Sequence, residues 1–65
     1  MKIKEKKTGE VVEAWNPSTE PEPGWFVRDS VSDLCIRKNP DAIWRRQGSC
    51  LVQILAFDDE YEVVS

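Results

Sequence analysis

The first sixteen residues contain two short segments whose apolar and polar positions are typical of strands. Ile3 alternates with lysines in residues 1–7, and valines with a tryptophan give residues 10–16 a strong β propensity. Thr8-Gly9 separates the two segments, and glycine adopts the positive φ that a tight turn requires. We therefore predict an antiparallel hairpin across this turn.

A proline-rich stretch follows the hairpin. Residues 16–24 contain three prolines, which remove backbone donors and favour extended conformations in the residues before them. This composition predicts a surface loop that ends the second strand. Residues 25–28 (Trp-Phe-Val-Arg) are a candidate for a short strand after the loop.

Two later stretches allow either a helix or a strand. Residues 30–38 fit a short helix with Ser30 as N-cap, but they contain several weak helix formers and a proline follows soon, so we favour a strand over residues 34–37. Residues 40–47 fit a two-turn helix, with a capping residue and a proline at its start and arginines at its end. They fit equally well a turn followed by a strand through Ile43-Trp44.

The longest apolar run spans residues 49–57 and predicts the central strand of a sheet, buried on both faces. Asp58-Asp59 end this run, and residues 61–64 have the pattern of a closing strand. Together the segments predict a mainly β fold. We expect a small barrel or a rolled antiparallel sheet of about five short strands, with at most one short helix near residues 40–47.

The length of 65 residues fits one small domain, residues 1–65. Apolar residues make up 40% of the chain, and three tryptophans supply much of the available core. An enclosed ligand site needs about 300 Å³ or more, so we do not expect an internal pocket. The net charge of −3 indicates solubility more than any particular partner.

Cys35 and Cys50 are the two cysteines of the chain. We expect both to be reduced and buried as small apolar side chains, with a single disulfide between them as the alternative. A structural zinc site needs four ligands and the chain has no histidine, so we expect no zinc site. Residues 58–60 are acidic and could bind a hard cation, but they lack a specific loop motif, so we expect no other metal site, and we expect no cofactor. No stretch has the pattern of a signal peptide or a membrane span, which predicts a cytoplasmic protein without a membrane partner.

Three parts of the sequence form a recognisable combination, namely Lys2–Lys7 with Val11–Trp15, Pro23–Val27, and Phe57–Val64. Together they resemble small phage and prophage proteins built around a Pro-Gly-Asp-Tyr-Gly-like turn. Trp25 stands where that pattern has an acidic residue, and residues 37–48 have no counterpart. The resemblance implies a small β fold and a bacterial host cell, but it implies no chemistry and no functional residues.

These observations favour a non-enzymatic protein. Without histidine, a nucleophilic cysteine has no obvious activating base, so we expect no catalytic residues. The leading hypothesis is a phage- or prophage-type accessory protein that binds and modulates a host protein, with homodimerisation as a second expected interaction.

The alternative hypothesis is a small β-barrel that binds single-stranded nucleic acid. Such proteins stack bases on exposed aromatic rings beside positive charge, and Trp44 is followed by two arginines. The negative net charge argues against it. The candidate binding residues for both hypotheses are Trp44, Arg45, Arg46, Trp25 and Arg37.

Overall fold

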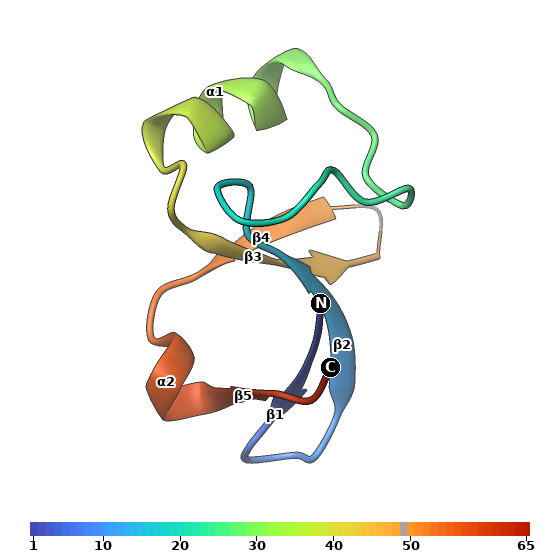
Figure 1. The fold of residues 1–65 in the computed structure, drawn as a ribbon, viewed down its shortest axis with the longest axis vertical. Coiled ribbons are helices and arrows are strands. Elements are labelled where there is room, and N and C mark those ends of the chain that lie inside the picture. The colour runs from blue at the N-terminus through green and yellow to red at the C-terminus, as the bar shows by residue number, and fades with distance from the viewer. Residues whose placement is uncertain (49) are drawn as a thin grey trace.

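A computed structural model describes residues 1–48 and 50–65 as one five-stranded antiparallel sheet with two short helices (Figure 1). The elements are β1 (Lys2–Glu5), β2 (Val11–Trp15), α1 (Ser30–Lys38), β3 (Ile43–Gln47), β4 (Cys50–Ile54), α2 (Phe57–Glu60) and β5 (Tyr61–Val63). The strand order is β4-β3-β2-β1-β5, and the two outer strands do not pair, so the sheet is rolled rather than closed. The predicted mainly β, rolled-sheet fold is therefore confirmed.

The predicted N-terminal hairpin is also confirmed. β1 and β2 pair antiparallel with Ile3 opposite Val12, and Gly9 in the connection has a φ of +75°. This backbone conformation explains why the turn has a glycine, since other residues rarely adopt it.

The sheet has a hydrophobic cluster on each face, and neighbouring residues of β2 divide between them. Ala14 belongs to one cluster and Trp15 to the other, because successive side chains of a strand point to opposite faces. The first cluster contains Ile3, Ala14 and Tyr61, with Met1, Val12, Ile43, Ile54 and Phe57 packed against it. The second contains Trp15, Ile36 and Trp44, with Trp25, Phe26, Ala42 and Leu51 packed against it.

The same alternation makes residues 43–47 a strand and not the helix that their capping pattern allows. Ile43 packs against the first cluster and Trp44 lies in the second, and a two-turn helix would not place these neighbours on opposite sides. β3 pairs antiparallel with β4 along its whole length, from Ile43 opposite Ile54 to Gln47 opposite Cys50. The strand alternative for residues 40–47 is therefore confirmed; the expected limit of one short helix, near residues 40–47, is wrong, because α1 and α2 both lie elsewhere.

The strand favoured over residues 34–37 is also wrong, because Ser30–Lys38 forms α1. Asp29, one residue before the cap that the sequence indicates, is the N-cap, and its Oδ1 accepts a hydrogen bond from the Ser32 amide at 2.8 Å. Ile36 then anchors the helix in the second cluster. Residues 25–28, a candidate strand, lie outside the sheet in the connection that leads to α1.

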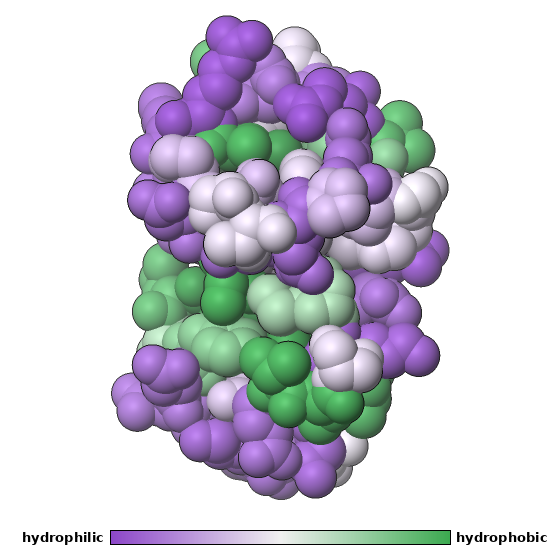
Figure 2. All heavy atoms as spheres, in the orientation of Figure 1, coloured by the Kyte–Doolittle hydropathy of each residue, from purple (hydrophilic) through white to green (hydrophobic). Residues whose placement is uncertain are grey.

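β4 is an edge strand, whereas its apolar run predicts the centre of the sheet. None of its five residues is buried. Both cysteines are exposed and free, Cys35 on α1 and Cys50 at the start of β4, so the expectation of buried thiols is wrong as well. In the view of Figure 2, hydrophobic residues gather across the middle of the molecule, between more hydrophilic ends.

Candidate functional site

Trp44 is not available as a stacking platform, because its side chain is only 5% exposed. It lies opposite Trp15 in the pairing of β2 with β3, and both rings belong to the second cluster. The indole Nε1 of Trp44 is buried without a hydrogen-bond partner among the described residues. The ring is therefore part of the core and not of a binding surface.

The two arginines after Trp44 point to opposite faces of the sheet. Arg45 donates a hydrogen bond through Nη1 to the Tyr61 hydroxyl at 2.7 Å and lies 3.9 Å from a Glu5 carboxylate oxygen. Arg46 lies over the Trp25 ring, 5.8 Å from its centroid, and donates to the Gly48 carbonyl at 3.1 Å. The predicted Trp-Arg-Arg group thus does not form one surface.

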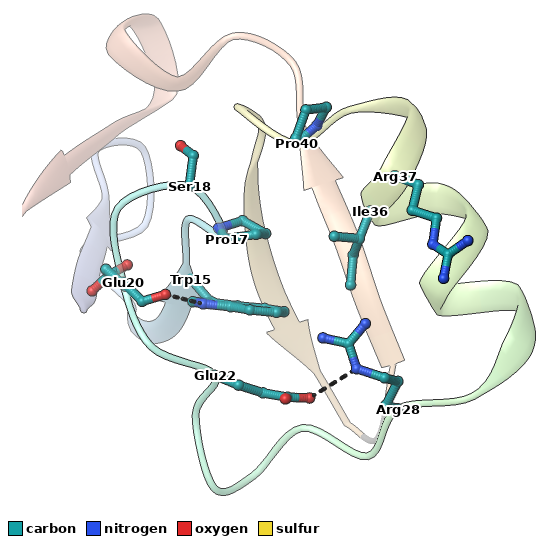
Figure 3. Close-up of a pocket in the computed structure, with 9 residues that line it drawn as sticks. All are labelled: Trp15, Pro17, Ser18, Glu20, Glu22, Arg28, Ile36, Arg37 and Pro40. Carbon is teal, nitrogen blue, oxygen red and sulfur yellow. Dashed lines mark hydrogen bonds and ion pairs between the residues drawn. The ribbon is translucent and has the colours of Figure 1, made fainter.

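Arg37, the remaining predicted site residue, lies at an open hollow of about 420 Å³ between the proline-rich loop and α1 (Figure 3). Trp15 and Ile36 form apolar walls, and Pro17 and Pro40 lie at its margins. The Trp15 indole is fixed there because its Nε1 donates to the Glu20 carbonyl at 3.2 Å.

The two arginines at this hollow are already paired with carboxylates. The Asp33 carboxylate binds Arg28 through one oxygen and Arg37 through the other, and Glu22 lies 3.4 Å from Nε of Arg28. The hydrogen bond with Asp33, assisted by Glu22, raises the pKa of Arg28 above its ordinary value. An anionic ligand would have to displace these carboxylates, so the hollow offers it little net attraction.

The outer side of α1 carries unpartnered apolar side chains. Val31 is 70% exposed and Leu34 is 59% exposed, and Cys35 is exposed beside them. These residues have the i, i+3, i+4 spacing that places side chains on one helix face, whereas Ile36 points inward. Val27, just before the helix, is 81% exposed. We call Val27, Val31, Leu34 and Cys35 the α1 surface.

This α1 surface continues towards the edge of the sheet. Val27 and Val31 line a shallow hollow of about 250 Å³ together with Cys50 and Leu51 at the start of β4. The sequence contains the spacing of Val31 and Leu34, but it does not show their exposure. Their exposure follows from the helix over residues 30–38, which packs on the sheet through Ile36.

In the part of the chain that the structure describes, no group of three or more acidic or cysteine side chains is arranged to hold a metal ion. Neither α1 nor α2 is long and apolar enough to cross a membrane.

The resemblance of three segments to small phage proteins stays a prediction. Its matching residues lie in β1 and β2, in the connection before α1, and in α2 with β5. Comparisons with protein-family models, with curated proteins and with solved structures found no match for this chain.

Proposed function

We propose that this protein is a non-enzymatic interaction module that docks the α1 surface on another protein. The observation that carries the proposal is the outward apolar stripe of Val31, Leu34 and Cys35 on a helix whose inner side is already packed through Ile36. A short helix with this stripe fits the mode in which a helix lies in an apolar groove of its partner.

The energetics favour such an interface. Complete burial of a valine or leucine side chain contributes about 1.5–3 kcal/mol, and the exposed side chains of the α1 surface gain most of this on contact. Lys38 lies in the last turn of α1 and is exposed. A partner groove with acidic residues at its margin would therefore suit this helix better than a basic one.

The resemblance to small phage proteins supports a bacterial host protein as the partner and the bacterial cytoplasm as the location. The proposal assigns no catalytic step, because a chain without histidine offers neither exposed cysteine its usual activating base.

Binding of single-stranded nucleic acid receives less support from the structure. Trp15 and Trp44 are buried, and the half-buried Trp25 ring already has Arg46 over it. A base would have to displace this arginine to stack on Trp25.

The test is capture of a bacterial protein by immobilised wild type and by three glutamate variants. Leu34→Glu and Val31→Glu place a charge on the α1 surface, and Val11→Glu places the same charge on β2, where Val11 is also exposed. We expect each of the two helix variants to capture at least about tenfold less of the bacterial protein than wild type, since burying an unpaired charge is costly. Val11→Glu should capture as much of this protein as wild type does, and the circular dichroism of all three variants should be unchanged. Equal capture by all four proteins would refute the proposal.

A further inference from the structure

The outer edge of β4 is open for pairing. β4 lies at one end of the strand order and pairs only with β3. Apart from that ladder, no backbone hydrogen bond of residues 1–48 and 50–65 involves a residue of β4. An edge of this kind presents a row of free N–H and C=O groups to another strand.

β4 also lacks the features that usually protect an edge. Its sequence, Cys-Leu-Val-Gln-Ile, contains no charged residue and no proline. The opposite edge, β5, is only three residues long and has Glu62 at its centre, where Glu62 forms an ion pair with Lys4 at 3.3 Å. Two copies meeting at β5 would bring their Glu62 residues together, which disfavours that edge for self-association.

We propose that a second copy of this chain pairs with β4, giving a two-fold symmetric dimer with a continuous ten-stranded sheet. Antiparallel pairing centred on Val52 places Val52 opposite Val52, Leu51 opposite Gln53, and Cys50 opposite Ile54 of the other copy. Each position then lies opposite an uncharged residue, so no like charges oppose each other across the pair of β4 strands.

The dimer is expected to be concentration-dependent. A five-residue edge alone is smaller than the interfaces of about 1,200–2,000 Å² that hold stable complexes together. Val52 and, just after the strand, Leu55 are exposed beside the edge and add apolar area. The small core of the monomer, with six buried hydrophobic residues among those described, gains stability from such pairing.

The two-fold axis of an antiparallel edge pair is perpendicular to the sheet, so it leaves the same sheet face on the same side in both copies. α1 packs on the face that carries Trp15 and Trp44, so both helices of the dimer lie on one side. On the basis of the proposed function, the dimer presents two α1 surfaces to partners and gains from bivalent binding.

The first test is disulfide trapping at the centre of the edge. Val52→Cys and, as control, Val63→Cys on β5 are made with both natural cysteines replaced by serine; Val52 is 39% exposed and Val63 is 56% exposed. We expect mild oxidation to trap most of the Val52→Cys protein as a covalent dimer, since directly opposed strand positions lie within reach of a disulfide. Val63→Cys should remain largely monomeric. Equal trapping of the two variants would show random collision and overturn the proposal.

The second test is sedimentation equilibrium of the unmodified chain from about 10 μM to about 1 mM, the range for a weak dimer. We expect a reversible monomer–dimer equilibrium that Val52→Lys abolishes and Val63→Lys leaves unchanged, with both variants folded by circular dichroism. A monomer at every concentration overturns the dimer but leaves the α1 proposal intact if capture still depends on Leu34. Pairing of β4 with a strand of the captured protein in place of a second copy would also overturn it.

Discussion

Arg45 Nη1 donates a hydrogen bond to the Tyr61 hydroxyl at 2.7 Å, and this contact joins two strands that are not neighbours in the sheet. β3 and β5 are separated in the sheet by β2 and β1, so the bond crosses the concave side of the rolled sheet. The Arg45 guanidinium also lies 5.9 Å from the Tyr61 ring centroid. An arginine that the sequence suggests for nucleic acid thus holds the rolled sheet together.

Replacing Tyr61 by phenylalanine tests this contact. The variant keeps the ring but removes the acceptor for Arg45, and we expect it to lower the free energy of unfolding by about 1–2 kcal/mol in urea titrations. Arg45→Met should make the Tyr61 change smaller, leaving only the longer hydrogen bond that the Tyr61 hydroxyl donates to Glu5 at 3.4 Å. The exposed ion pair of Lys4 with Glu62 is the control, and Glu62→Gln should cost less than about 0.5 kcal/mol. A Tyr61→Phe variant as stable as wild type would contradict this role.

Two buried tryptophans differ in the hydrogen bonding of their indole groups. Trp15 Nε1 donates to the Glu20 carbonyl, whereas Trp44 Nε1 has no partner among the described residues. We therefore expect Trp15→Phe to be about 1 kcal/mol more destabilising than Trp44→Phe in chemical denaturation. The reverse order would show that the Trp44 indole has an acceptor in solution.

Tryptophan fluorescence gives a separate check on the core. Acrylamide should quench mainly the half-buried Trp25, so Trp25→Phe should remove most of the quenchable emission. If Trp44→Phe removed it instead, Trp44 would be exposed and the nucleic-acid hypothesis would regain its stacking ring.

Glycine at position 9 is required by its backbone conformation. Gly9→Ala should lower the free energy of unfolding by about 1–2 kcal/mol, because alanine is strained at a φ of +75°. Gly24 has no positive φ and no atom within 4 Å of an added Cβ, so Gly24→Ala should be neutral or slightly stabilising. Thermal unfolding of the two variants side by side tests the hairpin.

The N-cap of α1 makes helix stability depend on pH. Hydrogen bonding from the Ser32 backbone amide lowers the pKa of Asp29 below its ordinary value. The ionised cap therefore stabilises α1 fully above that value, and its contribution is lost as pH falls through the lower folded-state pKa. Asp29→Asn should keep the cap but remove this dependence. Amide exchange in α1, followed from pH 6 to about pH 2, should separate wild type from variant only at the acidic end.

The sequence predicts the parts of this fold that depend on neighbouring residues. The hairpin at Gly9 and the closing strand at Tyr61 have local patterns, namely alternation and turn chemistry, and the structure confirms both. The position of β4 has no such pattern, because an apolar run looks the same at the centre and at the edge of a sheet. Sheet order depends on which strands pair, and that is a property of the whole chain.

The candidate site depends on tertiary packing even more strongly. Cys35 and Ile36 are adjacent in α1, yet one is exposed and the other is buried. Weak helix formers at these positions favour a strand by propensity alone, and the packing of Ile36 against Trp15 and Trp44 outweighs that preference. The outward apolar stripe of the helix therefore became visible only in the structure.

The most direct test of the α1 surface uses Cys35 as its own reporter. In a Cys50→Ser variant, the alkylation rate of Cys35 is measured with and without a saturating amount of the captured partner protein. The account predicts that the partner slows this alkylation at least about tenfold, because a docked helix face excludes the reagent. An alkylation rate that the bound partner leaves unchanged would mean that the partner binds elsewhere, and the central claim would be wrong.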